Sequence, residues 1–87
     1  MARYPARLTK DDSNILVTFR DVPEAITFGK NEKDALENAV DALETGLSFY
    51  IDDGKEWPEP SAAVDSEKLV FISHAFAMRS RLERDQE

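Results

Sequence analysis

The sequence contains no cysteine and a single histidine, His74, among its 87 residues. Without cysteine there can be no disulfide bond and no thiolate ligand, and one imidazole cannot form a multi-histidine metal site. With only three glycines, the chain has no glycine-rich loop that could hold a phosphate group. We therefore expect neither a metal nor another cofactor, and we interpret His74 as a structural residue at the end of a strand.

Long apolar runs are also missing. No run approaches the ~18 residues that span a bilayer, and residues 1–10 lack the apolar centre of a secretory signal. The sequence thus predicts a cytoplasmic protein with no membrane partner. Its length predicts one domain with a small core, and we expect a homodimer because pairing with a second copy would add buried surface.

Charge is distributed unevenly along the chain. The formal net charge is −7, and residues 31–67 alone contain eleven acidic residues against Lys33 and Lys55. Such a segment repels a nucleic-acid backbone and attracts a basic protein, because phosphate binding requires lysines and arginines that neutralise it. An acidic, solvated helix face with no partner is the alternative interpretation.

Four short segments have the composition of β-strands. Residues 3–9 alternate between apolar and polar side chains, and residues 15–20 are rich in β-branched and aromatic side chains. A polar turn between them predicts a hairpin. After a bend at Asp21-Val22-Pro23, residues 25–28 predict a third strand. Residues 67–73 predict a fourth strand, whose apolar run indicates cover on both faces or a place inside a dimer.

One long helix is predicted between the third and fourth strands. Asn31 is a suitable N-cap, and Gly54 is placed to take the left-handed conformation after a last turn near Ile51. Large apolar residues at helical spacing run beside a stripe of small ones: Leu36, Val40, Leu43, Leu47 and Tyr50, and Ala35, Ala39, Ala42 and Gly46. The small residues predict close packing of the helix on the sheet.

These elements predict an α+β domain over residues 1–73, followed by a helical or disordered tail over residues 74–87. A right-handed crossover through the helix would place the fourth strand parallel to the first, which gives a small mixed sheet. The order strand, strand, strand, helix, strand outlines a partial RNase-H-like fold. An RNase H site needs an acid on the first strand, but Pro5, Ala6 and Arg7 occupy that place, so we expect no enzyme activity.

Five short motifs follow one another along the chain. They are Tyr4-Pro5, Phe19 with Asp21-Val22-Pro23, Thr27-Phe28-Gly29, Asp34-Ala35-Leu36 and Pro58-Glu59-Pro60-Ser61. Together they resemble the HicB antitoxins of bacterial and phage toxin–antitoxin loci, over about residues 3–73. The resemblance implies the partial RNase-H-like fold. It also implies a partner, a small basic HicA-like toxin that cleaves mRNA with a histidine and is neutralised when the antitoxin covers that site.

The resemblance gives a use to the acidic side of the helix. Its carboxylates recur at spacings of three and four residues, away from the apolar stripe: Asp34, Glu37, Asp41 and Glu44. We expect these residues to face the toxin, with Asp41 at the centre. Glu24 and Phe28 stand where many family members carry a glycine and a polar residue. An edge strand with an aromatic side chain next to an acidic helix predicts a docking rim at these two residues, and a purely structural corner is the alternative interpretation.

Longer family members continue into a DNA-binding domain, whereas this sequence ends at Glu87. Three arginines lie in the tail, Arg79, Arg81 and Arg84. They are too few to indicate DNA binding, so we expect no DNA binding by this chain. Two other functions remain open. One is a solitary acidic module, phage-encoded for example, that binds another basic protein, and the other is a degenerate nuclease.

Overall fold

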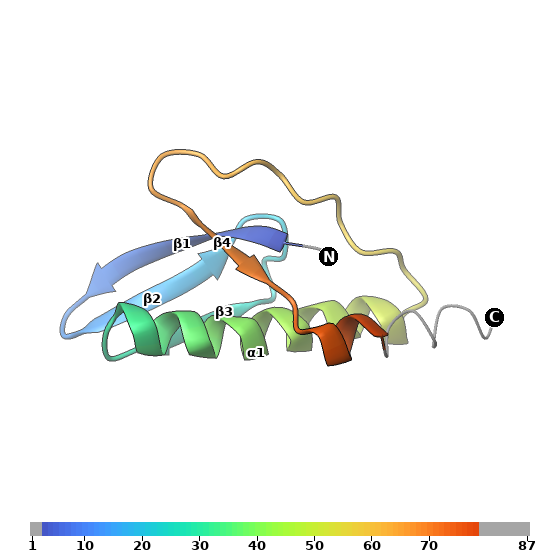
Figure 1. Ribbon diagram of the computed structural model, residues 1–87, viewed down its shortest axis with the longest axis horizontal. Helices are drawn as coiled ribbons and strands as arrows, with labels where there is room; N and C mark the ends of the chain where they lie inside the picture. Colours follow the sequence, from blue (N-terminus) through green and yellow to red (C-terminus); the bar gives the residue numbers. More distant parts are fainter. Residues whose placement is uncertain (1–2, 79–87) are drawn as a thin grey trace.

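The computed structural model describes residues 3–78, in which a four-stranded sheet packs against one long helix (Figure 1). The elements in chain order are β1 (Arg3–Asp11), β2 (Asn14–Phe19), β3 (Ile26–Gly29), α1 (Glu32–Asp52) and β4 (Lys68–Phe71). The strand order across the sheet is β3-β2-β1-β4, and α1 lies along one face. The structure confirms the predicted α+β class, while the likeness to RNase H stays a prediction.

β1 and β2 form the predicted hairpin, joined by Asp12 and Ser13. Asp11 pairs with Asn14 across the turn, and Asp12 takes a positive φ of 55°, a conformation that aspartate tolerates in tight turns. Side chains then alternate between the two faces of the sheet, so that the face toward α1 is apolar. The buried residues that β1 and β2 contribute to that face are Tyr4, Ala6, Val17 and Phe19.

The segment between β2 and β3 is a buried corner. Val22 and Ala25 are enclosed by the core, and the Ala25 N–H donates to the Val22 carbonyl at 2.9 Å. Pro23 and Glu24 lie exposed on the outside of the corner. The corner directs the chain into β3, which begins one residue later than predicted.

α1 begins and ends within one residue of the predicted bounds. The Asn31 side chain accepts from the Asp34 N–H at 2.8 Å, and Gly54 has a φ of 70° just beyond the last turn. The buried side of the helix contains mostly small residues: Ala35, Ala39, Leu43, Gly46 and Leu47. Three of the larger predicted residues pack half-buried at its margin: Leu36, Val40 and Tyr50. Small side chains at the centre let the helix approach the sheet closely.

β4 runs antiparallel to β1, so the predicted parallel pairing and the mixed sheet are wrong. All the pairings in the sheet are antiparallel. The prediction treated α1 as the whole crossover. After α1, however, residues 55–63 run back past the sheet as an extended chain, and a turn at residues 64–67 then reverses their direction (Figure 1). Because of this second traverse, β4 enters the sheet from the opposite end.

β4 is covered on one face only. Val70 is 4% exposed, whereas Leu69 is 42% and Phe71 is 51% exposed. Cover on both faces, which the apolar sequence indicated, is therefore not provided by residues 3–78. The second expectation for this strand, a place inside a dimer, stays a prediction.

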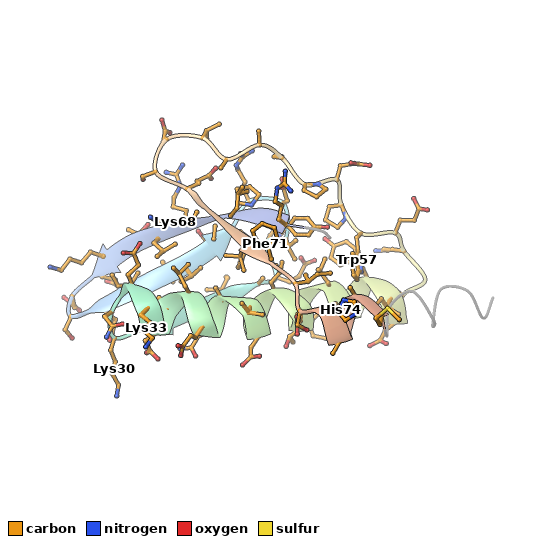
Figure 2. All side chains as sticks on the ribbon, viewed as in Figure 1. Lys30, Lys33, Trp57, Lys68, Phe71 and His74 are labelled. Atoms are coloured by element: carbon orange, nitrogen blue, oxygen red, sulfur yellow. The ribbon has the colours of Figure 1, made fainter. Side chains whose placement is uncertain are left out.

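The described part of the tail forms a short helical segment over residues 74–78 that packs on the domain. Trp57 and Phe76 stack with ring centroids 5.8 Å apart, and both contact the core. His74 opens this segment and is exposed, shortly after β4 as predicted (Figure 2). Residues 79–87, with the three arginines considered for DNA binding, lie outside the described residues.

Candidate protein-binding surface

The predicted carboxylates of α1 follow one side of the helix, but the structure gives them different surroundings. Glu37 and Asp41 are exposed, whereas Asp34 and Glu44 are half-buried. The Asp34 side chain accepts from the Lys30 N–H at 2.9 Å, which makes it part of the N-terminal cap. Asp34 therefore has a structural use, and its contact with a toxin stays a prediction.

Glu44 holds the segment that follows β4. Its Oε2 accepts from the Ser73 N–H at 2.6 Å, and the Ser73 hydroxyl in turn accepts from the Phe76 N–H at 3.1 Å. The carboxylate thus fixes the start of the short helical segment against α1. A toxin that contacted Glu44 would compete with this bond, so Glu44 is less available than the two exposed carboxylates.

Asp41 lies beside an open hollow between α1 and β3. The hollow has a volume of about 340 Å³ and is lined by Glu24, Ile26, Thr27, Asn38, Asp41, Ala42 and Thr45. Two of the predicted site residues, Glu24 from the corner and Asp41 from the helix, are therefore brought to one place. Glu24 also accepts a long hydrogen bond of 3.4 Å from the Tyr50 hydroxyl, which helps to orient it.

The hollow combines negative charge with apolar surface. Lys30 and Lys33 lie at the N-terminal end of α1 (Figure 2), and Lys68 pairs there with Glu32 at 3.4 Å. The hollow itself is lined by two carboxylates and no basic residue. Aliphatic side chains next to carboxylates suit a lysine or arginine, whose stem is apolar and whose head is charged. The hollow therefore fits a basic side chain of a partner.

Phe28 does not line the hollow. It is 48% exposed and shares the face of the sheet opposite α1 with Ile26, which is 57% exposed and also borders the hollow from the edge of β3. Sequence reasoning missed Asn38 and Thr45 as lining residues, although they stand three positions before and four after Asp41 and so share its side of the helix. Ile26 was missed because only the structure shows how far β3 is left uncovered.

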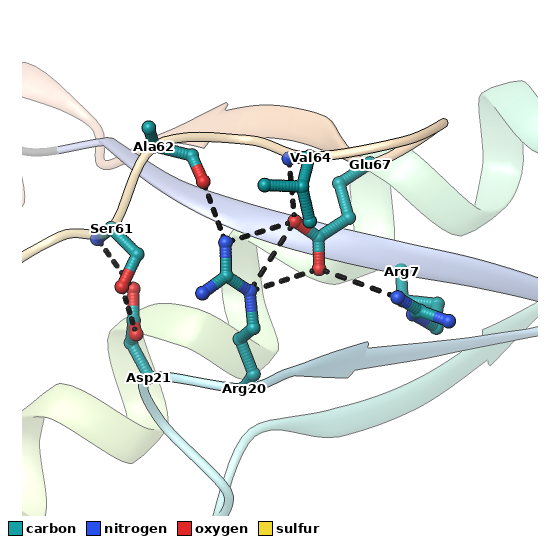
Figure 3. A network of polar contacts seen from close by, with 7 residues as sticks. All are labelled: Arg7, Arg20, Asp21, Ser61, Ala62, Val64 and Glu67. Carbon is teal, nitrogen blue, oxygen red and sulfur yellow. Dashed lines mark hydrogen bonds and ion pairs between the residues drawn. The ribbon is translucent and has the colours of Figure 1, made fainter.

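A cluster of polar contacts fastens the linker between α1 and β4 to the sheet (Figure 3). The Arg20 guanidinium donates to both carboxylate oxygens of Glu67, at 3.1 Å each, and to the Ala62 carbonyl at 2.6 Å. Arg7 approaches the same carboxylate at 3.9 Å, and the Val64 N–H donates to it at 3.0 Å. Glu67 is therefore held from β1, from the residue that follows β2 and from its own turn.

A second contact fixes the linker where it passes the end of β2. Asp21 accepts from the Ser61 N–H at 2.7 Å and from the Ser61 hydroxyl at 2.8 Å (Figure 3). Near the start of β1, the Tyr4 hydroxyl donates to the Pro58 carbonyl at 2.8 Å. These contacts join residues far apart in sequence, so no local spacing could have predicted them. They hold in place the return path that sets the direction of β4.

The stability of this linker should depend on pH through Glu67. Hydrogen bonds, first from Arg20 and then from the Val64 N–H, lower the pKa of Glu67. Because folding lowers this pKa, Glu67 contributes its full stabilisation at pH values above its pKa in the unfolded chain, about 4.3. The stabilisation is lost as the pH falls through the pKa of Glu67 in the folded chain. We expect the melting temperature of the unsubstituted chain to fall more steeply than that of Glu67→Gln between about pH 5 and pH 3.

Circular dichroism melts of the two proteins across this pH range measure the difference. All other carboxylates are common to both chains, so their titration cancels in the comparison. Parallel curves for the two proteins would show that folding does not lower the pKa of Glu67.

Two further features of residues 3–78 bear on the kinds of site the chain can offer. This part of the chain contains no helix that is long and apolar enough to cross a membrane. Nor does it bring three or more histidine and acidic side chains together as a potential metal site. The hollow between α1 and β3 offers two carboxylates, Glu24 and Asp41, beside apolar surface.

A family model described as the HicB_like antitoxin of bacterial toxin-antitoxin system matches residues 3–80. The chain belongs to this HicB-like antitoxin family. Antitoxin HicB of Escherichia coli K12 is 43% identical over 78 residues, which cover 88% of this chain and 56% of that protein. Antitoxin HicB 2 of Photorhabdus laumondii is 44% identical over 59 residues, which cover 68% of this chain and 42% of that protein.

This HicB-like chain spans about half the length of the curated relatives it matches. A solved structure of the N-terminal domain of Burkholderia pseudomallei antitoxin HicB superposes with a TM-score of 0.64 at 21% identity. The match covers 83% of this chain and 99% of that domain. At this level of identity the likeness concerns the fold, and it places the sheet and α1 of the HicB-like chain in a known arrangement.

Proposed function

We propose that this HicB-like chain neutralises a small basic toxin of the HicA type by covering the surface with which the toxin binds and cleaves RNA. The observation that carries the proposal is the hollow between α1 and β3, where Glu24 and Asp41 stand together on a member of an antitoxin family. Glu37 extends the negative surface along α1 as an exposed neighbour. On this account the chain acts by binding, without catalysis of its own.

The physical basis is competition for one basic surface. A protein that binds RNA neutralises phosphates with lysines and arginines, and an acidic protein surface can occupy the same side chains. A carboxylate next to the toxin's histidine would also pair with the imidazole and favour its charged form. We assign this place to Asp41, the most central of the exposed carboxylates. A toxin that acts on mRNA would meet the antitoxin in the cytoplasm.

We also propose that the chain forms a homodimer through β4. Support comes from Leu69 and Phe71, which are 42% and 51% exposed on a strand at the edge of the sheet. Large apolar side chains on an open edge are unfavourable in a monomer, and pairing with a second copy would bury them. Sedimentation equilibrium tests the proposal, because Phe71→Lys should then shift the chain from dimer to monomer.

Co-expression tests the toxin proposal. We expect a basic toxin encoded beside this chain to arrest bacterial growth, and co-expression of the chain to restore it. The two proteins should also purify together through a tag on either one. Growth arrest that persists with the antitoxin present, and a toxin that purifies alone, would contradict the proposal.

A further inference from the structure

The outer edge of β3 has unpaired backbone groups, as the pairing of the other strands shows. Pro5 pairs with Leu69, and proline has no N–H, so these two residues cannot exchange hydrogen bonds across β1 and β4. Along an antiparallel ladder, hydrogen-bonded and non-hydrogen-bonded residue pairs alternate. The next pair, Ala6 with Lys68, is therefore hydrogen-bonded, and the backbone N–H and C=O groups of Ala6 point toward β4. The backbone groups of Arg7 therefore face β2, where they bond Thr18.

The same alternation continues to the far side of the sheet. Since Thr18 bonds β1, its neighbour Val17 bonds β3 through Thr27, and the N–H and C=O groups of Ile26 and Phe28 point outward. A contact outside the ladder agrees with this result. The Asn38 side chain donates to the Phe28 carbonyl at 2.8 Å, which requires that this carbonyl point away from β2. The edge beside the hollow thus offers backbone groups as well as charge.

We infer that the outer edge of β3 receives an extended segment of the basic toxin as an added strand. This inference rests on the proposed function and states how the toxin docks. In an added strand, alternate side chains point to opposite faces. Those on the α1 side would reach Glu24 and Asp41, whereas those on the other side would lie beside Ile26 and Phe28. The partner segment therefore alternates basic and apolar residues.

Charge complementarity decides in favour of the toxin and against a second copy at this edge. A second copy would bring its own Glu24 and Asp41 toward the same carboxylates, and like charges placed together oppose association. The Asn38 side chain further occupies one outward carbonyl of the free protein, which blunts the edge against unspecific pairing. A basic strand would be attracted by the two carboxylates, and the Phe28 carbonyl can accept a second hydrogen bond from it because a carbonyl oxygen has two lone pairs.

Amide hydrogen exchange on the unsubstituted 87-residue chain tests this inference, with the toxin of the neighbouring gene as the probe. The amides of Ile26 and Phe28 should exchange rapidly in the free chain and slow by about 100-fold in the complex. The amides of Thr27 and Gly29, which face β2, should be protected in both states. Binding without a change at Ile26 and Phe28 would overturn the inference.

Proline variants provide a second test with a matched control. Ile26→Pro removes one outward N–H at the β3 edge and should weaken toxin binding by about 10-fold. Ile26→Ala keeps the N–H and should weaken binding less. Equal effects of the proline and alanine variants at position 26 would contradict strand addition.

The outcomes separate this inference from the function on which it rests. If the unsubstituted chain fails to bind the toxin, the proposed function fails and the docking mode fails with it. If the chain binds the toxin but the β3 edge exchanges as before, only the docking mode is wrong. Concentration-dependent protection of Ile26 and Phe28 in the chain alone would assign the edge to a second copy, which also overturns the inference.

Discussion

Replacing Gly29 with alanine is expected to destabilise the domain by about 3 kcal/mol, the upper range for an overpacked core. A Cβ atom at Gly29 would overlap the backbone nitrogen and Cα of Ala35 and lie 2.7 Å from its Cβ. Neither side can yield easily. Gly29 is paired with Ile15 in the sheet, and the Ala35 N–H is bonded to the Asn31 carbonyl at 2.9 Å in the first turn of α1. Urea unfolding measures the loss.

Gly46→Ala is the matched control for this prediction. A Cβ atom at Gly46 would meet the ends of side chains, Val22 Cγ1 at 3.0 Å and Ala25 Cβ at 3.4 Å. These contacts are tight, but alanine also favours the helix by up to about 1 kcal/mol. We expect the two effects to offset each other to within about 1 kcal/mol. A Gly29→Ala protein as stable as Gly46→Ala would contradict the close approach of α1 to β3.

The second large effect is expected on toxin binding. Reversing both charges at the hollow, in the double variant Glu24→Lys and Asp41→Lys, should raise the dissociation constant by about 100-fold, or about 2.7 kcal/mol. The reason is that a basic partner would meet two ammonium groups where it now meets two carboxylates. Asp41 is exposed, and Glu24 makes a single long contact to Tyr50, so folding should be little affected.

The control carries the same change in net charge at sites away from the hollow. Asp11→Lys and Asp52→Lys together alter two exposed residues, at the hairpin and at the end of α1, and neither lines the hollow. Isothermal titration of both double variants against the toxin separates a local effect from a general one. Similar losses of affinity in the two variants would show that overall charge, and not the hollow, determines binding.

The sequence predicted those parts of the fold that local chemistry determines. Asn31 and Gly54 set the two ends of α1, and the alternation in residues 3–9 indicated that Tyr4 and Ala6 are buried, although it did not indicate the burial of Pro5 between them. The direction of β4 could not be predicted in this way. It depends on the contacts of Arg20 with Glu67, which join residues far apart in the sequence. It also depends on a turn within the linker that is too short to leave a pattern in the sequence.

The candidate site could be predicted only in part, because the grouping of its residues also depends on contacts between distant parts of the sequence. Helical spacing grouped the carboxylates of α1, but it could not show that Glu44 bonds a backbone N–H of the segment after β4. Nor could it place Glu24 beside Asp41, because their proximity depends on the corner that packs against Gly46. The identity of the surface residues was readable from sequence, and their grouping required the fold.

The most direct measurement of the central claim is a titration of the toxin's RNA cleavage with the 87-residue chain. Purified toxin at a fixed concentration cleaves a labelled RNA while increasing amounts of the chain are added. We predict that cleavage stops near equimolar amounts, and that the double variant at Glu24 and Asp41 needs a large excess to reach the same inhibition. Full cleavage in the presence of excess unsubstituted chain would contradict the account.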